Sequence, residues 1–390
     1  MTTSRSLDAI QAFCDRQAAW TAETAEGLTR LESPTTDKAA VDRCGHELAN
    51  RLQRLGASVT RLPHETAGDH ILAEMGEGPA RILLLGHFDT VWPVGQLARM
   101  PLERKGDRLF GPGVFDMKGG ITIAMLAARA LFEAGPPPAC RLAMLWTSDE
   151  ETGSVASEAS ILEQAGQSDA VLVLEPSGPQ GALKTSRKGC GQFEMVVTGV
   201  AAHAGIEPER GCSAVHELAR QIVDLESLHD SESGVTVNVG QVRGGTHANV
   251  IAAEARAMID IRVETLKDAD RLQRVMKTRT SVDDRTRVRT TGHFRPPLER
   301  TAAVVRLYEI ARAVASELGH DLGEFATGGG SDGNLTAARG IATLDGLGAV
   351  GEGAHALHEQ IDLSAVPWRA ALLAGVIDRL AARGASLASH

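Results

Sequence analysis

The sequence predicts an α/β protein that carries a second, α+β domain inserted into the first. Over the first 187 residues, compact apolar runs alternate with helical stretches, which is typical of a sheet with helices on both faces. The hydrophobic pattern changes near Lys188, where segments of alternating apolar and polar residues begin. The aliphatic helical pattern returns after the proline pair Pro296-Pro297. We therefore predict one domain formed by residues 1–187 and 298–390 and an inserted domain formed by residues 188–297.

The first part of the chain predicts helices followed by buried strands. Apolar residues recur at helical intervals from Leu7 to about Leu31 and again from Ala39 to Leu55, which indicates two amphipathic helices separated at Pro34. Three buried strands and two more helices follow. The strands are Ile82–Leu85, Leu142–Trp146 and Ala170–Leu174, and the helices are Gly120–Phe132 and Val155–Leu162.

The inserted part predicts strands with one exposed face, because apolar and polar residues alternate along them. Its strands are Phe193–Val197, Val235–Val242 and Ala257–Val263, and its helices are Ala214–Leu228 and Leu266–Thr278. The chain after the proline pair then completes the first domain. This last part comprises the helix Ala302–Leu318, a glycine-rich turn, the short strand Ile341–Leu344 and a helix from Val366 to about Ala382.

Composition limits the classes of partner. A formal net charge of −10 argues against non-specific nucleic-acid binding, which needs clustered Lys and Arg. No apolar run approaches the roughly 20 residues of a membrane-spanning helix, so we expect no membrane partner. A small molecule or a peptide is the expected ligand.

The cysteines and the start of the sequence predict a cytoplasmic location. The five cysteines lie far apart, without the paired spacing of a disulfide framework or a zinc knot. The first twenty residues lack the continuous apolar stretch of a secretory signal. We therefore expect reduced cysteines that serve in packing.

His87 follows a predicted buried strand. It is expected at the carboxyl end of the sheet, where open α/β folds place their sites. Asp89, two residues further on, is suited to hydrogen-bond the other imidazole nitrogen and to fix the tautomer of the ring. A structural hydrogen bond without a metal is the alternative interpretation of this pair.

Asp116 lies in a glycine-rich turn, residues 111–120, which opens a predicted helix. A helix cap is the usual explanation of such an aspartate. The flanking glycines would also let the backbone approach an ion, and a carboxylate can bridge two metals with its two oxygens. This segment alone leaves both explanations open.

Three carboxylates, Asp149, Glu150 and Glu151, crowd the end of a predicted apolar strand. Their mutual repulsion is costly unless a cation or a shared proton relieves it. One glutamate is suited to bind a metal while its neighbour acts as general base and acid. A solvated acidic turn is the alternative, but it fits poorly at the mouth of a buried strand.

Glu175 and His355 complete a set of metal-ligand residue types. Glu175 ends a predicted strand, where an ordinary strand-end carboxylate is the alternative, and His355 lies in the glycine-rich loop 351–359. His358 competes for the role of His355, which we favour. Two imidazoles with several carboxylates predict a site for two zinc ions per subunit, although Co²⁺ or Mn²⁺ would also suit its oxygen-rich character.

Taken together, these segments resemble the M20 family of metallopeptidases. The segments that carry the resemblance are residues 86–91, 116–120, 149–151, 174–176 and 353–355, and their order and spacing span nearly the whole chain. Three further segments resemble the glutamate carboxypeptidase type within that family. They are residues 90–93, 202–205 and 295–297.

The resemblance implies a zinc-peptidase catalytic domain with a mixed sheet flanked by helices. It also implies a role for each residue of the site. Glu150 is the general base, and Asp89 supports His87. In this family the peptide bond after the bridging aspartate is typically cis. The implied ligands are Asp116, which bridges the two zinc ions, His87 and Glu175 on one ion, and Glu151 and His355 on the other.

The inserted domain resembles the lid of the family, which also forms the dimer interface, so a homodimer through this domain is expected. His203 is implied as a donor to the substrate oxyanion, in some relatives from the partner protomer; a polar loop histidine is the alternative. Asn249 and Arg262 match positions that bind the free carboxylate of the substrate. Arg295 is a further candidate, because guanidinium groups pair with carboxylates through two parallel hydrogen bonds, although a strand arginine is more often simply solvated.

We therefore predict a glutamate carboxypeptidase-like hydrolase. It would cleave the amide that joins an acyl group to a C-terminal or free amino acid whose carboxylate serves as a handle. An N-acyl-amino-acid deacylase, of the acetylornithine deacetylase or succinyl-diaminopimelate desuccinylase kind, is the alternative among enzymes. A non-catalytic ligand-binding relative would be expected to lack Glu150 or a ligand, and all of them are present.

Two further features bear on the substrate. Arg187, Lys188 and Arg210 are candidate partners for an acidic leaving residue. The glycine-rich segment 328–333 lacks the lysine and the preceding strand of a nucleotide-binding loop. It resembles the family's loop beside the substrate pocket.

Overall fold

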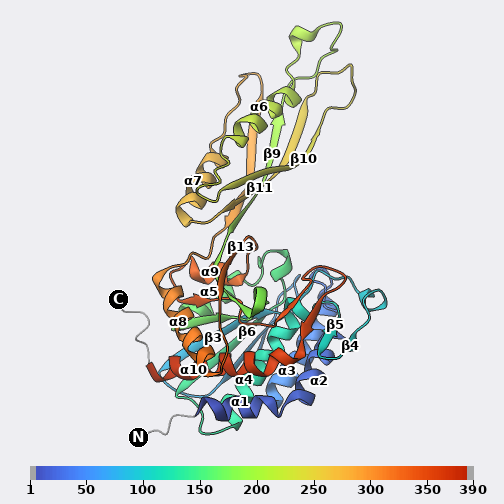
Figure 1. Ribbon diagram of the computed structural model, residues 1–390. Helices are drawn as coiled ribbons and strands as arrows, with labels where there is room; N and C mark the ends of the chain where they lie inside the picture. The colour runs from blue at the N-terminus through green and yellow to red at the C-terminus, as the bar shows by residue number, and fades with distance from the viewer. Residues whose placement is uncertain (1–5, 384–390) are drawn as a thin grey trace. The chain divides into compact units, whose positions relative to one another are not determined.

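The computed structural model describes residues 6–383, and these fall into two compact units (Figure 1). Over the described residues, the first unit comprises residues 6–185, 300–326 and 331–383, and the second comprises residues 186–299 and 327–330. The domain boundaries expected from the sequence lie within two residues of the divisions at 185 and 300. Residues 1–5 and 384–390, which the sequence places in the first domain, lie outside the described residues.

A mixed six-stranded sheet forms the centre of the first unit. In order across the sheet, its strands are β1 (Ser58–Leu62), β2 (His70–Met75), β6 (Cys140–Thr147), β3 (Ala80–His87), β7 (Ala170–Val173) and β14 (Thr343–Leu344). From β6 to β14 neighbouring strands are parallel, whereas β1 and β2 pair antiparallel. The carboxyl ends of four strands therefore meet at one edge, and the segments that follow them gather there.

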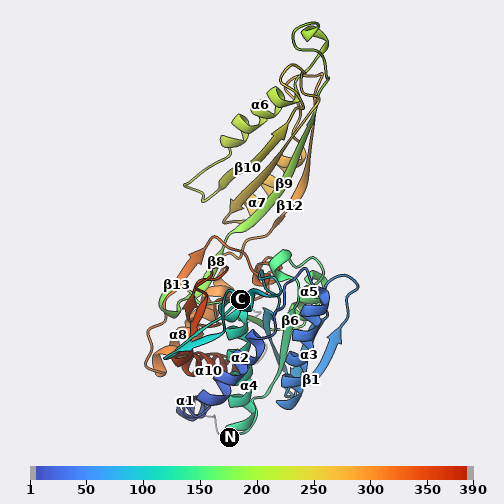
Figure 2. The same ribbon diagram turned by 90° about the vertical axis from the view of Figure 1, so that its right-hand side faces the viewer.

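Helices cover both faces of this sheet, as two perpendicular views show (Figures 1 and 2). On one face pack α1 (Leu7–Asp15), α2 (Ala18–Thr29), α3 (Lys38–Arg54), α4 (Gly119–Glu133), α8 (Ala302–Glu317) and α10 (Val366–Arg383). On the other face pack α5 (Glu158–Gly166) and α9 (Asp332–Ala337). The predicted α/β architecture is confirmed.

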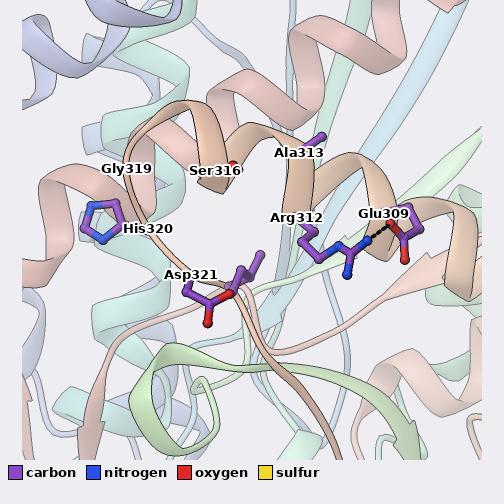
Figure 3. Close-up of a pocket in the computed structure, with 8 residues that line it drawn as sticks. Glu309, Arg312, Ala313, Ser316, Gly319, His320 and Asp321 are labelled. Atoms are coloured by element: carbon purple, nitrogen blue, oxygen red, sulfur yellow. Dashed lines mark ion pairs between the residues drawn. The ribbon is translucent and has the colours of Figure 1, made fainter.

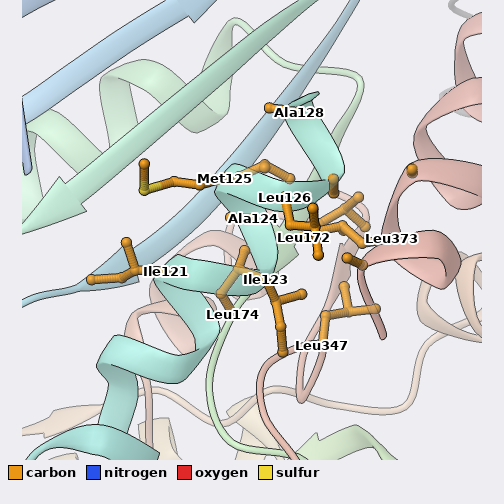
Figure 4. Close-up of a cluster of buried hydrophobic side chains, with 14 of the residues drawn as sticks. Ile121, Ile123, Ala124, Met125, Leu126, Ala128, Leu172, Leu174, Leu347 and Leu373 are labelled. Carbon is orange, nitrogen blue, oxygen red and sulfur yellow. The ribbon is translucent and has the colours of Figure 1, made fainter. Parts of the chain in front are cut away.

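The core shows why these strands appear in the sequence as continuous apolar runs. Successive side chains of a strand point to opposite faces. Leu84 of β3 accordingly joins one buried cluster, whereas Leu83 joins another on the opposite face. Figure 4 shows part of the first cluster, where Leu126 of α4 lies near Leu172 and Leu373. Both faces of the sheet are therefore buried at its central strands β3 and β7.

One predicted helix is in fact two. The stretch from Leu7 to Leu31 forms α1 and α2, with a break at Arg16 and Gln17. No glycine or proline marks this break in the sequence. Helix α1 packs on α10 and α4, whereas α2 packs on α3 and α4, so the break comes from packing against different neighbours.

Two small sheets complete the first unit. One is antiparallel and contains β15 (Gly351–Glu352), β16 (Gln360–Asp362), β5 (Arg108–Phe110) and β4 (Glu103–Lys105). The other pairs β13 (Glu324–Thr327) with β8 (Leu183–Arg187), and the last residues of these two strands belong to the second unit. The pairing of β16 with β5 places the loop that contains His355 beside the turn that leads to Asp116.

The second unit is an antiparallel sheet with two helices. Its strands, in order, are β10 (Thr236–Gly244), β11 (Glu254–Val263), β9 (Gly189–Thr198) and β12 (Arg287–Arg295), and α6 (Ala214–Glu226) and α7 (Leu266–Lys277) pack on one face. The sequence did not predict β12, because its few apolar residues leave little alternation to detect.

Residues 327–330 group with this unit because Lys188 N donates to Thr327 O and Arg187 donates to the carbonyls of Gly329 and Gly330.

Short helical turns connect the larger elements. They are η1 (Gln96–Ala98), η2 (Val114–Lys118), η3 (Glu150–Thr152), η4 (Pro179–Gly181), η5 (Pro208–Arg210) and η6 (Leu363–Ala365). Within residues 6–383, every helix is too short or too polar to cross a bilayer.

Candidate metal centre

His87 is the last residue of β3 and is buried beneath the carboxyl edge of the sheet. Its Nε2 lies 3.2 Å from Asp116 Oδ1 and 3.5 Å from Glu175 Oε1. Its Nδ1 lies 3.3 Å from Asp89 Oδ1 and 3.1 Å from the carbonyl oxygen of Asp89. One ring nitrogen therefore faces a pair of carboxylates while the other is oriented by Asp89.

Asp116 lies between two histidines. It occupies the turn η2 before α4, and its peptide bond to Met117 is cis, as the resemblance implies. While Oδ1 faces His87, Oδ2 lies 3.3 Å from His355 Nε2. The turn depends on Gly113, which has a φ of 73° and where a Cβ would collide with the side chain of Thr90.

Glu150 and Glu151 lie together in η3, which follows β6. Glu151 Oε2 is 3.2 Å from His355 Nε2. The backbone N–H groups of Glu150 and Glu151 donate to the two oxygens of Asp89, at 3.3 and 3.2 Å. Asp89 therefore orients both the His87 ring and the turn that carries the two glutamates.

His355 and Glu175 reach the cluster from separate segments. His355 lies in the loop between β15 and β16 and has a φ of 60°, while its side chain is half exposed. The structure places His355, rather than the exposed His358, against Asp116 and Glu151. Glu175 follows β7 and is buried, and its carbonyl oxygen accepts from Gly348 N at 2.9 Å.

The cluster has the geometry of a cation site. His87, Asp116 and Glu151 each offer one ligand atom, and these three atoms lie within 4.8 Å of one another. The sequence separates these residues by tens of positions, and they meet because each follows or faces the carboxyl edge of the same sheet. Their residue types, imidazole nitrogen and carboxylate oxygen, are those that bind zinc.

The pKa values of these groups show that the cluster favours positive charge. Hydrogen bonds to Asp116 and Glu151 raise the pKa of His355 to about 10. Burial alone would lower the pKa of His87, but its contacts with Asp116, Asp89 and Glu175 outweigh burial and raise it well above the usual value. Burial would likewise raise the pKa of Asp116, but the two histidines lower it.

For Glu151, burial outweighs hydrogen bonding in setting the pKa. Burial raises the pKa of this carboxyl, and the hydrogen bond with His355 offsets only part of the effect. The carboxylates thus stabilise protonated imidazoles, and a divalent cation at the same point would supply the positive charge while leaving the imidazoles neutral as ligands.

Two residues that support this cluster, the partly buried Thr35 and the buried Glu359, have no assigned role in the sequence interpretation. Thr35 Oγ1 donates to Asp89 Oδ2 at 2.6 Å. Glu359, four residues after His355, accepts a hydrogen bond from the backbone N–H of Asp116 at 3.0 Å. Burial raises the pKa of Glu359, whereas its N–H donors act in the opposite direction. Nothing local in the sequence marks either residue, because their partners come from distant segments.

His203 and Asn249 lie together in the second unit. His203 is exposed in a loop after β9 and forms an isolated bridge with Val250, and Ala204 N donates to Asn249 O at 2.9 Å. The ring Nδ1 of His203 accepts from Gly205 N at 3.2 Å. The structure therefore brings the predicted oxyanion donor and one predicted carboxylate-binding residue side by side.

Arg262 and Arg295 lie on β11 and β12, each in register with Cys190 of the intervening strand β9. Direct cross-strand partners point to the same face of a sheet, so the two arginines share one face. Arg262 also forms an ion pair with Asp260 at 2.8 Å and donates to the carbonyl oxygen of Gly328 at 3.3 Å. Gly328, at the start of the glycine-rich segment 328–333, thus lies against Arg262 within the second unit.

The remaining basic candidates are engaged within their own unit. Arg187 is buried and holds the glycine-rich loop. Lys188 donates to Gly234 O at 2.6 Å and lies 3.4 Å from Glu264, and the exposed Arg210 forms an ion pair with Glu207 at 2.7 Å. These contacts weaken the case for all three as substrate partners.

A surface hollow elsewhere in the first unit contains none of the predicted residues. It is lined by side chains of α8 and of the turn 319–322, including the ion pair between Arg312 and Glu309 at 2.9 Å (Figure 3). The ring of His320 stacks on Trp368 at a centroid distance of 4.3 Å. The buried cluster around Asp116, rather than this hollow, is the candidate site.

Because the sequence predicts His355 as a zinc ligand, its replacement by alanine is expected to lower zinc binding and activity about 10- to 100-fold or more, since a ligand contributes at least as much as the residues that orient it. His358→Ala is the matched control from the same loop, and it should bind zinc and turn over substrate like the unmodified protein. Zinc content by atomic absorption, together with kcat, measures both. A stronger loss in His358→Ala would reverse the assignment.

Comparison with known proteins places the chain in a family. Residues 83–379 match the model of peptidase family M20/M25/M40. The chain is 32% identical to carboxypeptidase G2 of Pseudomonas sp. (strain RS-16) over 384 residues, which cover 96% of this chain and 92% of that protein. It is 30% identical to succinyl-diaminopimelate desuccinylase of Xanthomonas euvesicatoria pv. vesicatoria (strain 85-10) over 356 residues, covering 84% of this chain and 92% of that protein.

The fold is also that of solved relatives. The crystal structure of aminopeptidase PepT from Bacillus cereus matches with a TM-score of 0.76 at 22% identity, covering 93% of this chain and 99% of that one. The family model matches from β3 to α10 and therefore includes all five of the predicted metal ligands. The chain belongs to peptidase family M20/M25/M40, a family of metal-dependent hydrolases.

Proposed function

We propose that this protein is a di-zinc hydrolase that cleaves the amide between an acyl group and an amino acid with a free carboxylate. The observation that carries the proposal is the position of Asp116, whose two oxygens face two different imidazoles. In this arrangement Asp116 would bridge two ions. His87 and Glu175 would hold one ion, and Glu151 and His355 would hold the other.

The chemistry divides between the ions and the side chains around them. Bound zinc lowers the pKa of water and polarises a carbonyl group. Glu150 takes the proton of the attacking water and returns it to the departing amine. Glu150 is suited to this because its backbone is held by Asp89 in the same turn as Glu151.

The second unit would supply recognition of the substrate. His203 would donate to the carbonyl oxygen as negative charge develops there. Asn249, Arg262 and Arg295 would bind the free carboxylate, because planar guanidinium groups match its two oxygens. The contact between the His203 and Asn249 segments, and the shared sheet face of Arg262 and Arg295, support two recognition points within this unit.

A C-terminal amino acid, glutamate above all, is the leaving group that we favour. The observation behind this choice is the match to carboxypeptidase G2 over almost the whole chain. Deacylation of an N-acyl amino acid is the second candidate, and the matches to succinyl-diaminopimelate desuccinylases favour it. Both reactions break an amide next to a carboxylate-bearing carbon, so the same site serves either.

We further propose that the second unit acts as a lid and forms a homodimer. Strand β10 is an edge strand of its sheet, and edge strands present unpaired backbone groups that can pair with another chain. Val242 on β10 and Val223 on α6 are 56% and 70% exposed, which leaves apolar surface for such a contact. The oligomeric state in solution tests this proposal.

A cytoplasmic location is proposed on the basis of the cysteines. All five lie among the described residues as free thiols, and four of them are buried. Thiols of this kind persist in reducing compartments.

A substrate screen with metal analysis tests the proposed function. The zinc-loaded enzyme is expected to contain two zinc ions per chain and to hydrolyse C-terminal glutamyl amides. Cleavage of N-succinyl or N-acetyl amino acids instead would select the second candidate. Conversion of the free carboxylate of a substrate to a carboxamide should lower kcat/KM at least tenfold, since a buried charged hydrogen bond contributes about 1.5–3 kcal/mol.

Chelation provides the control for this screen. Activity should disappear when a chelator removes zinc and return when zinc is restored. A fully loaded enzyme that hydrolyses none of these compounds, or one that is indifferent to the chelator, would contradict the proposal.

A further inference from the structure

Glu359 is a fully buried carboxylate whose partners are all N–H groups. Its side chain is inaccessible to solvent. Oε2 accepts from Trp92 Nε1 and from Gly113 N, both at 2.8 Å. Oε1 accepts from Phe115 N at 2.9 Å and from Asp116 N at 3.0 Å. Four N–H donors, none of them on a charged side chain, therefore surround one carboxylate.

The backbone of Glu359 is tied to the same segments. Its carbonyl oxygen accepts from Gly111 N at 3.2 Å, and its N–H donates to Ala356 O at 3.0 Å. Glu359 thus joins the turn 111–116, the loop that contains Trp92 and the loop that contains His355. The pairing of β16 with β5 lies next to these segments, and the contacts of Glu359 extend that connection into the turn and the two loops.

We propose that Glu359 is a positioning residue that sets Asp116 against His355, and thereby the spacing of the two ions, an inference that rests on the proposed di-metal function. Asp116 N and Glu359 are joined directly, and Glu359 follows His355 by four residues. The side chains of Asp116 and His355 are also in direct contact, with 3.3 Å between Asp116 Oδ2 and His355 Nε2. The proposed bridging carboxylate and the histidine that faces it therefore share one anchor.

A carboxylate is required here because each of its oxygens accepts two hydrogen bonds. Glutamine has the same shape but one acceptor oxygen, and its NH2 group would face two N–H donors. Either the Phe115 and Asp116 pair or the Trp92 and Gly113 pair would then lack an acceptor. A buried donor left without an acceptor is unfavourable, so the turn that carries Asp116 would shift.

The test compares Glu359→Gln with Glu217→Gln as a matched control. Glu217 is equally buried, and it accepts hydrogen bonds from Val282 N at 2.9 Å and Asp283 N at 3.3 Å in the second unit. Zinc affinity is measured by competition with a chromophoric chelator, alongside kcat, KM and the Tm of the zinc-depleted protein. Both variants are expected to lower Tm, which makes Glu217→Gln a control for loss of stability.

Glu359→Gln is expected to weaken zinc binding about 10- to 100-fold, as loss of a residue that orients a ligand does. It should lower kcat while KM stays within about twofold, because the carboxylate-binding residues are untouched. Glu217→Gln should keep the zinc affinity of the unmodified protein. A folded Glu359→Gln protein with unchanged zinc affinity and kcat would overturn the inference, and so would an equal loss of zinc affinity in Glu217→Gln.

Trp92→Phe covers the case in which Glu359→Gln does not fold. This substitution removes one of the four donors and leaves the carboxylate in place, so we expect a smaller weakening of zinc binding in the same direction. Unchanged zinc affinity in Trp92→Phe would then decide against the inference. If the unmodified protein itself fails to bind zinc, the proposed function fails instead, and the two failures are thereby distinguished.

Discussion

Replacement of Glu150 by glutamine is expected to lower kcat by about 10²- to 10⁴-fold, the usual contribution of a general acid–base group, while zinc content stays unchanged. Glutamine preserves the shape of the side chain but cannot take a proton from water. The turn itself should keep its position, because the backbone N–H groups of residues 150 and 151 donate to Asp89. Steady-state kinetics and metal analysis of the same preparation measure the two effects.

Glu151→Gln is the matched control, one residue away in the same turn. Glu151 contacts His355, so its replacement should reduce zinc content as well as activity. Comparison of the two variants thus distinguishes a general base from a metal ligand. Near-normal turnover in Glu150→Gln would refute its assignment as the base, and so would a loss of zinc equal to that in Glu151→Gln.

The second large effect is expected at Asp116. Asparagine keeps one oxygen and replaces the other by an NH2 group, which cannot bind a metal ion. Because the two oxygens of Asp116 face His87 and His355 separately, Asp116→Asn should abolish bridging and release at least one ion per chain. Activity is expected to fall to the level of the chelator-treated enzyme.

Asp149→Asn serves as the control for Asp116→Asn. Asp149 is buried and lies in the acidic run that also contains Glu150 and Glu151. Its Oδ2 accepts a hydrogen bond from Ala156 N at 2.7 Å, a contact that the asparagine oxygen can keep. This variant should retain zinc and most of its activity. Full zinc occupancy in Asp116→Asn, measured by atomic absorption, would show that the carboxylate does not bridge.

Much of the fold follows from local pattern. The strand that ends at His87 and the strand that precedes Glu150 appear as continuous apolar runs because helices cover both faces of the sheet. This pattern is visible in the sequence. Strands β1, β2 and β12, the short strands of the two small sheets and the division of the first helix were missed. In β12, polar residues outnumber apolar ones, and the break at Arg16 and Gln17 comes from packing on different helices, which no local pattern records.

For the candidate site, the sequence by itself determined which chemistry is available: imidazoles and carboxylates placed where strands end, which together predicted a metal-dependent hydrolase of the M20 family. Only the tertiary structure decided which groups meet. It placed His355 rather than His358 against Asp116 and Glu151, and it identified Glu359 as the acceptor for the turn of Asp116. The physical reason is that residue type and strand position are local properties, whereas a contact between side chains more than 200 residues apart depends on how the loops pack, which the local sequence does not record.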